Sequence, residues 1–240
     1  MNIVLGPSAA DAALVPGRSQ DFEDFIYLIS HDVRNSVRAL IEVPQWIAED
    51  LRDSGVQVTG SVAENIDLMN VHTRRLDRML ADLLVYSRIG RLQDMVRVDL
   101  MDAWDTVRQE VAVPRSVRVE TDLGQPRLLF GERDIMTLLT ALLSNAVRHR
   151  DGDTTLVRFT SRQEGDETVL TFQDNGPGIA LQFREKAFSA MATLKSRDEV
   201  EGSGMGLAHV RKIVEAYGGQ IRWLDLTGGR GVGFEFRFAE

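Results

Sequence analysis

The amino-acid sequence predicts a two-domain α+β protein, a helical hairpin followed by an α/β sandwich in which helices pack on a mixed sheet. Apolar residues recur every three or four positions over 21–51 and 61–88, a spacing typical of long helices. After residue 91, β-rich runs and glycine turns alternate with shorter helical patterns. We therefore expect a disordered leader over 1–20, the hairpin over 21–91 and the sandwich over 92–240.

The composition argues against several classes of protein. The 240 residues carry a net charge of −8 with no basic block, which disfavours binding to nucleic acid or to an anionic membrane surface. Without cysteine the chain has no disulfide, thiolate metal site or cysteine nucleophile. No apolar run approaches the roughly 18 residues that cross a bilayer, so we expect a cytoplasmic protein without membrane insertion.

The two long helices predict a homodimer. They exceed the usual length of globular helices, and a single hairpin cannot bury its apolar stripe on itself. A four-helix bundle made by two chains is the expected completion. On the first helix the predicted stripe falls within an arc of roughly 120°. It consists of Phe22, Phe25, Ile26, Ile29, Val33, Val37, Leu40, Pro44, Ile47 and Leu51.

His31 stands outside this stripe. It lies about 170° from the centre of the arc, so its ring is expected to face solvent, with Asn35 one turn further on. An exposed histidine on a helix is most often a solvated polar residue. Alternatively, the neighbouring Asp32 orients the ring and leaves the other nitrogen as a neutral nucleophile near pH 7. The residues alone leave both interpretations open.

Beyond residue 91 the periodicities predict a series of shorter helices and strands. Helices are expected over 99–111, 131–150 and 205–217. Strands are expected over 117–121, 154–163, 168–173, 220–226 and 231–238, with a turn at 227–229.

Three motifs in this half carry chemistry that a nucleotide requires, although each alone is a weak signal. In "LLSNAVRHR", the amide oxygen of Asn145 on a rigid helix can ligate Mg²⁺. In "DNGPGI", Asp174 at a strand end can accept a hydrogen bond from an exocyclic amine such as that of adenine. In "EGSGMGL", glycines before a helix let backbone N–H groups approach phosphate oxygens. No Gly-Lys-Ser or Gly-Lys-Thr is present, so the motifs do not form a P-loop.

Taken in order, these motifs resemble a known family. The stretches "SHDVRN", "SNAVRH", "DNGPGI" and "EGSGMGLAHVRKIVEAYGG" are similar to the H, N and two G boxes of bacterial sensor histidine kinases, over about residues 21–240. The stretch "RRLDRMLADLLVYSRI" also resembles the second helix of that family's dimerisation and phosphotransfer domain. The resemblance implies a dimeric helical hairpin followed by a Bergerat-type ATP-binding domain.

The resemblance also implies roles for individual residues. His31 matches the phosphoacceptor, Asp32 its acidic partner, and Asn35 the residue that positions water with Asp32 for phosphatase action. Asn145 matches the Mg²⁺ ligand and Asp174 the carboxylate that reads adenine. The other nucleotide-binding positions are Arg148, Gly176, Gly178, Gly202, Gly204, Gly206 and Leu207, the candidates Lys195 and Arg197 in a lid over 188–203, and His149, for which packing and nucleotide contact are both open.

The sequence departs from the family pattern at three positions. Ser36 replaces a usual proline after the histidine, which weakens the expected helix bend. Ala141 stands where kinases carry an asparagine and related ATPases a catalytic glutamate. Its methyl group cannot activate water, which favours phosphoryl transfer over hydrolysis but suggests weaker metal binding. Met191 replaces a common lid aromatic, which suggests a looser lid.

The implied function is that of an ATP-dependent protein-histidine kinase with ATP and Mg²⁺ as cofactors. It autophosphorylates His31 and passes the phosphoryl group to an aspartate of a response-regulator receiver domain, with a phosphatase role left open. The alternative is a phosphotransfer or scaffold protein with a degenerate ATP-binding domain. No sensor domain is recognisable, so input is expected either through the leader or from a separate sensory protein.

Overall fold

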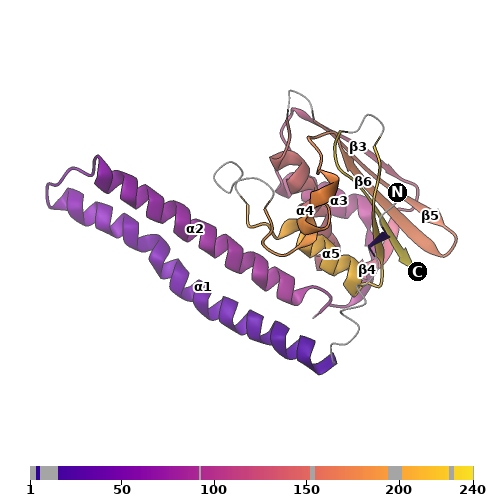
Figure 1. Ribbon diagram of the computed structural model, residues 1–240, viewed down its shortest axis with the longest axis horizontal. Coiled ribbons are helices and arrows are strands. Elements are labelled where there is room, and N and C mark those ends of the chain that lie inside the picture. The colour runs from indigo at the N-terminus through magenta and orange to yellow at the C-terminus, as the bar shows by residue number, and fades with distance from the viewer. Residues whose placement is uncertain are drawn as a thin grey trace. The chain divides into compact units, whose positions relative to one another are not determined.

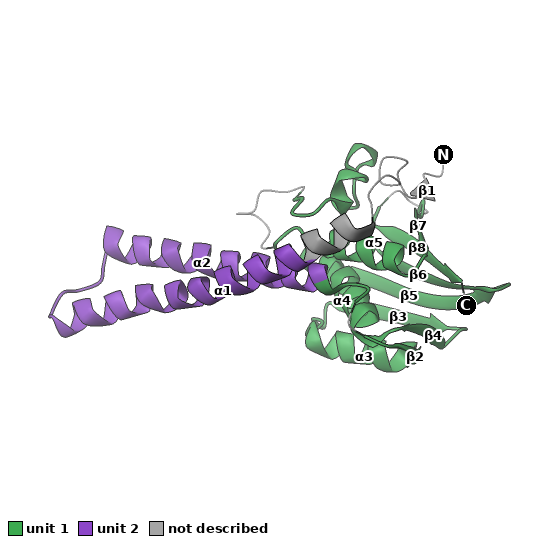
Figure 2. Cartoon of the chain, turned by 90° about the horizontal axis from the view of Figure 1, so that it is seen from below, with its two compact units in different colours: residues 1–13, 88–240 green, residues 14–87 purple. Residues whose placement is uncertain are grey.

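The computed structural model describes residues 4–5, 16–91, 93–151, 155–193, 202–226 and 230–239, with side chains of the first helix from residue 24 onward. These residues form two compact units (Figure 2). The hairpin unit comprises Leu14–Ser87, and the sandwich unit comprises Met1–Ala13 together with Arg88–Glu240. None of the described helices is long and apolar enough to span a bilayer. The predicted hairpin followed by an α/β sandwich is confirmed.

The hairpin unit consists of two long helices, α1 over Pro16–Asp53 and α2 over Ser61–Arg88 (Figure 1). The turn between them contains Gly55 and Gly60 with φ of 78° and 59°, a conformation that glycine adopts without steric cost. The two predicted helices and the turn between them are therefore present.

The helix α1 begins earlier than the sequence pattern predicts. Its first residue is Pro16, so the expectation of a disordered leader over 1–20 is corrected for the last five of those residues. Proline suits a first helical position because the N–H that it lacks would have no partner within the helix there. The strand β1, Val4–Leu5, also falls in the predicted leader; residues 1–3 and 6–15 lie outside the described part of the chain.

The apolar stripe predicted on α1 is buried only in part. Val37 and Pro44 are buried as expected, together with Ser30. Other members stay exposed in the single chain, among them Phe25 at 56% and Leu40 at 50%. One neighbouring helix can cover only one narrow seam, and at 100° per residue the uncovered residues are centred roughly 80° away from that seam. We call these residues the exposed stripe: Phe25, Ile29, Val33, Leu40 and Ile47.

The sandwich unit contains a six-stranded sheet in the order β1-β7-β8-β6-β5-β3 and a two-stranded sheet of β2 and β4. Among the described strands of the six-stranded sheet, only β3 and β5 pair in parallel, and α3, α4 and α5 cover one of its faces (Figure 2). The strands are β2 Met95–Asp99, β3 Val117–Leu123, β4 Arg127–Gly131, β5 Thr155–Glu164, β6 Glu167–Asp174, β7 Gln220–Trp223 and β8 Gly233–Ala239. The α-helices are α3 Leu100–Glu110, α4 Glu132–Arg148 and α5 Gly206–Ala216, with 3₁₀ turns η2 Leu181–Phe183 and η3 Lys186–Phe188.

Most predicted elements of this unit are found close to their expected bounds, with two differences, and one prediction falls on residues that are not described. The small sheet of β2 and β4 has no counterpart among the sequence predictions, because each strand is only five residues long and is partly exposed. β7 ends at Trp223, three residues before its predicted end. The turn predicted at 227–229 lies outside the described residues.

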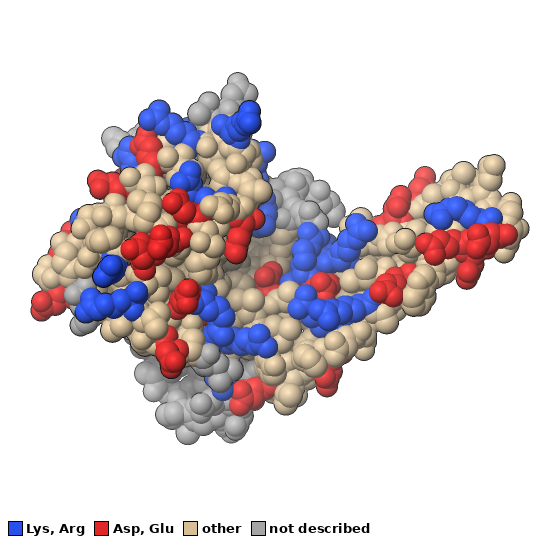
Figure 3. Space-filling model, turned by 180° about the vertical axis from the view of Figure 1, so that it is seen from behind, with Lys and Arg blue, Asp and Glu red and all other residues tan. Residues whose placement is uncertain are grey.

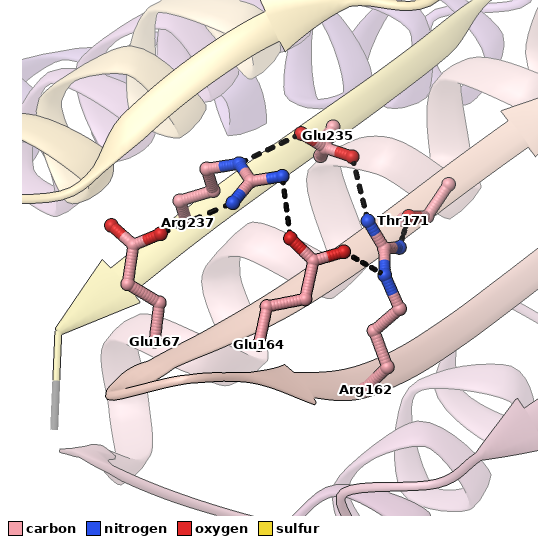
Figure 4. Close-up of polar contacts among 6 residues, drawn as sticks. All are labelled: Arg162, Glu164, Glu167, Thr171, Glu235 and Arg237. Atoms are coloured by element: carbon pink, nitrogen blue, oxygen red, sulfur yellow. Dashed lines mark hydrogen bonds and ion pairs between the residues drawn. The ribbon is translucent and has the colours of Figure 1, made fainter.

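The two faces of the large sheet have opposite character. The face under the helices is aromatic, with Trp104 of α3 packing 4.9 Å from Phe159 of β5, measured between ring centroids. The other face carries a network in which Arg162 and Arg237 bind surrounding carboxylates and a threonine (Figure 4). Acidic and basic side chains are also interspersed over the unit as seen in Figure 3. The network joins Arg162, Glu164, Glu167, Thr171, Glu235 and Arg237.

Candidate functional site

The histidine of the first motif lies on the solvent-exposed surface of α1. The side chain of His31 is 57% exposed and that of Asp32 is 83% exposed, so the predicted exposure is confirmed. The Nδ1 atom of His31 lies 3.1 Å from Oδ1 of Asp32, and Asn35 is exposed one turn further on. A proton on Nδ1, held by this carboxylate, leaves the lone pair on Nε2. The arrangement offers a nucleophilic nitrogen to an incoming group.

A side-chain contact holds α1 to α2 three residues after this histidine. The Nε atom of Arg34 donates to Oδ1 of Asp77 over 2.7 Å, and Nη2 donates to Oδ2 over 3.4 Å. The bonded guanidinium keeps the pKa of Asp77 below its usual value, against the opposing effect of burial. The two helices are therefore tied together close to His31.

The sandwich unit contains a cavity of about 180 Å³. The ends of α4, β6 and α5 bound it, so three motifs that are far apart in the sequence meet around one space. Among the predicted nucleotide-binding residues, the cavity is lined by Asn145, Arg148, His149, Asp174, Gly178, Gly202, Gly204, Gly206 and Leu207. Gly176 does not line it but contacts Asp174, while Lys195 and Arg197 lie outside the described residues.

Asp174 is the polar centre of this cavity. It is the last residue of β6, and its Oδ1 accepts hydrogen bonds from the N–H groups of Gly176 at 2.8 Å and Val232 at 3.2 Å. Burial raises the pKa of Asp174, and the two backbone hydrogen bonds oppose the rise. Because both of these donors use Oδ1, the Oδ2 atom remains as the acceptor for a ligand in the cavity.

Two of the loop positions require glycine both because φ is positive and because a neighbouring backbone atom leaves no space for a Cβ atom. Gly204 has a φ of 76°, and a Cβ there would lie 2.6 Å from the carbonyl oxygen of Ala192. Gly178 has a φ of 78°, and its Cβ would lie 2.9 Å from the oxygen of Gly231. At the start of α5, a Cβ on Gly206 would meet the amide of Asn145 at 3.5 Å. The N-terminus of a helix and the Asn145 amide are thus next to each other.

Part of the cavity wall is not identified by the motifs. Apolar residues line it on several sides, including Leu142 and Phe172, and Val232 and Phe234 come from the C-terminal end of the chain. Gly231 allows this approach, because a Cβ there would overlap the carbonyl oxygen of Asp174. The signal that could have revealed this wall is the glycine-rich stretch "GGRGVG" before β8.

Two of the three departures from the family pattern lie in this unit. Ala141 is buried in α4 and does not line the cavity. Met191 has a φ of 60°, which is unusual for a residue with a side chain, and its backbone lies against Gly204. The site therefore has the geometry of a nucleotide pocket without a carboxylate at position 141.

Residues 131–240, which include those that line the cavity, match the family model of the histidine kinase-, DNA gyrase B- and HSP90-like ATPases. The match extends to the hairpin in whole-protein comparisons. The chain is 29% identical over 227 residues to the methanogenesis regulatory histidine kinase FilI of Methanothrix harundinacea, covering 90% of this chain and 24% of FilI. The chain is therefore similar to sensor histidine kinases over both of its units.

Further relatives show the same similarity. The adaptive-response sensory kinase SasA of Thermosynechococcus vestitus is 28% identical over 232 residues, covering 90% of this chain and 59% of SasA. Two solved structures share the fold. Full-length ShkA in complex with AMPPNP has a TM-score of 0.65 at 19% identity, covering 90% of this chain and 45% of ShkA. ThkA in complex with the response regulator TrrA has a TM-score of 0.60 at 20% identity, covering 92% and 64%. The chain thus spans about a quarter of FilI and three fifths of SasA.

Proposed function

We propose that this protein is an ATP-dependent protein-histidine kinase that autophosphorylates His31. The observation that carries the proposal is the convergence of the asparagine, aspartate and glycine motifs on one cavity, in a chain that displays an exposed histidine on a long helix. Complexes of relatives add support, since ShkA was solved with AMPPNP. ATP is therefore the nucleotide that we assign to the cavity.

The residues of the cavity suit the parts of ATP. The carboxylate of Asp174 accepts a hydrogen bond from the amino group of adenine, and the apolar wall around Phe172 receives the base. The N-terminus of α5 and the loop glycines face the phosphates with backbone N–H groups. Asn145 would provide one oxygen ligand to Mg²⁺, which suits that ion because it usually keeps several waters and is bound by few protein ligands in kinase sites. Bound Mg²⁺ would neutralise charge on the phosphates.

Residues of the hairpin unit carry out the phosphoryl transfer. Nε2 of His31 attacks the γ-phosphorus in line, the new N–P bond forms as the bond to the ADP oxygen breaks, and ADP leaves with that electron pair. The carboxylate of Asp32 stabilises the imidazolium that develops. Positioning supplies most of the rate, since little other covalent chemistry is needed.

We extend the proposal to the partners. The phosphoryl group passes from His31 to an aspartate of a response-regulator receiver domain, a partner class supported by the ThkA complex with TrrA. Asp32 and Asn35, both exposed beside His31, would orient water for hydrolysis of the receiver's aspartyl phosphate, which releases inorganic phosphate. The exposed stripe of α1 supports a homodimer, because a second hairpin would cover it. We place this kinase in the cytoplasm, where ATP and response-regulator receiver domains are found.

The test is labelling from γ-labelled ATP. We expect His31→Gln to abolish acid-labile label while the affinity for AMPPNP with Mg²⁺, measured by titration calorimetry, stays as in the wild type. His72→Gln, at an exposed histidine of α2, is the matched control and keeps the label. Undiminished labelling of His31→Gln would discard the assigned role. Absence of any nucleotide binding by the wild type would favour the scaffold alternative.

A further inference from the structure

A second polar cluster lies at the ends of α4 and α5 that are remote from the cavity. Asp134, in the first turn of α4, is only 1% exposed. Its Oδ2 accepts a hydrogen bond from the N–H of Gly90 at 2.7 Å and another from the hydroxyl of Tyr217 at 3.1 Å. Tyr217 is the residue that ends α5, and its ring stacks on Phe130. A buried carboxylate thus holds the backbone just after α2.

Arg133, immediately before Asp134, also binds the backbone of the segment that follows α2. Its Nη2 donates to the carbonyl oxygens of Arg88 and Arg91, each over 2.7 Å, and its backbone N–H donates to Oε1 of Gln93 at 3.2 Å. Arg88 is the last residue of α2, and its carbonyl oxygen also accepts a hydrogen bond from the backbone N–H of Arg91 at 3.0 Å. A guanidinium at a helix C-terminus is also favoured by the helix dipole.

Glycines make the close packing of this cluster possible. Gly90 has a φ of 74°, and a Cβ on it would lie 2.8 Å from Cβ of Ala216. A Cβ on Gly131 would overlap both the hydroxyl of Tyr217 and the side chain of Gln93. Burial, followed by the charge of Asp134, raises the pKa of Tyr217 to about 12, so the hydroxyl keeps its proton and remains a donor.

We propose that Asp134, Arg133 and Tyr217 are positioning residues for phosphoryl transfer, which clamp the segment after α2 onto the sandwich unit. The proposal rests on the proposed function, since ATP in the cavity must reach a histidine on a different unit. The clamped segment packs as part of the sandwich unit and is not a loose linker.

The clamp matters because a rigid joint limits the arrangements that the two units sample. Joining two groups by a short stiff connection raises their effective concentration, and a loose connection lowers it. The two helices that reach the clamp also reach the cavity. The helix α4 carries Asp134 and Asn145, and α5 runs from Gly206 to Ala216 with Tyr217 as its C-cap. Loosening the clamp should therefore slow transfer to His31 and leave the bound nucleotide undisturbed.

The experiment uses the full chain with two variants and a control. Arg133→Gln removes an exposed side chain and Asp134→Asn weakens the buried acceptor. Arg118→Gln removes an arginine that is paired with Glu120 on β3, away from the cluster. Three quantities are measured: the initial rate of His31 labelling, the affinity for AMPPNP with Mg²⁺, and hydrogen exchange at the Gly90 amide.

We expect both clamp variants to lower the labelling rate about tenfold and to speed Gly90 exchange about tenfold, with nucleotide affinity within about twofold of the wild type. The control should change none of these. An unchanged labelling rate, an unchanged Gly90 amide, or a loss of affinity that parallels the loss of rate would overturn the proposal. A wild-type chain that takes no label would instead contradict the proposed function, while Gly90 exchange would still show whether the clamp holds the segment.

Discussion

At the scale of single residues, the ionisation of Asp174 should make nucleotide binding in the pocket depend on pH. It must be ionised to be a strong acceptor for the adenine amino group, and burial raises its pKa above the usual value. Nucleotide binding should therefore weaken as the pH falls through this raised pKa, at a higher pH than an exposed aspartate would require.

This prediction can be checked by calorimetric titration with AMPPNP over an acidic pH series. Asp174→Asn should bind about tenfold or more weakly at neutral pH, because a hydrogen bond to a charged group is lost. It should also show a flatter decline toward acid, since residue 174 no longer titrates. Parallel pH profiles for the two proteins would show that other groups cause the decline.

Substitution of Gly204 tests how closely the second glycine loop must approach Ala192. Gly204→Ala combines a strained φ of 76° with a Cβ placed 2.6 Å from the oxygen of Ala192. We expect it to destabilise the native loop by about 1–3 kcal/mol and to weaken AMPPNP binding.

The matched control is Gly165→Ala, in the turn between β5 and β6. Gly165 has a similar φ of 61°, but a Cβ there meets nothing within 4 Å. It should cost only the conformational strain and leave nucleotide affinity unchanged. Equal losses of affinity in the two variants, measured by calorimetry, would remove the argument from close approach.

At the scale of elements, the pair of Arg34 and Asp77 decides how α1 lies against α2. Both side chains are about a quarter exposed, so the pair is better shielded than a typical surface ion pair. A double-mutant cycle with Arg34→Gln and Asp77→Asn should give a coupling near the upper end of the surface range, about 1 kcal/mol.

Urea unfolding at neutral pH measures this coupling, with Arg108 and Asp105 as an exposed control pair within α3 that should give about 0.5 kcal/mol or less. The pKa of Asp77 is depressed in the folded chain. The stabilisation should therefore be present above the ordinary aspartate pKa and be lost as the pH falls through the depressed value. A coupling that does not change with acid would contradict this assignment.

At the scale of the whole molecule, the exposed stripe of α1 predicts self-association. Five large apolar side chains on one helix form a larger apolar surface than scattered single residues explain. Leu40→Glu would place a charge in the middle of the expected dimer interface, and we expect it to yield monomers by sedimentation. Leu28→Glu, at an exposed leucine roughly 110° away on the same helix, should remain dimeric. Dimers of both variants would place the interface elsewhere.

Local patterns were sufficient for much of the fold and of the site. Periodicity located α1 and α2, and the position of His31 on the helical wheel predicted its exposure because the helix continues unbroken past it. The glycine motifs predicted one wall of the pocket, since backbone conformation and phosphate binding both need glycine at defined places. The helical wheel of α1 did not distinguish the residues that α2 covers from the exposed stripe, because the predicted members of both sets are apolar.

The sequence by itself determined the types of the longer helices and strands, the exposed histidine and the chemistry of the three motifs, because each depends on neighbours within a few residues. Only the tertiary structure decided that Val232 closes the pocket on Asp174 and that Asp134 holds Gly90 and Tyr217, which are 44 and 83 residues distant in the chain. The physical reason is that a hydrogen bond between remote segments leaves no periodic trace in either one. Such bonds form only after sheet and helix packing have brought the segments together.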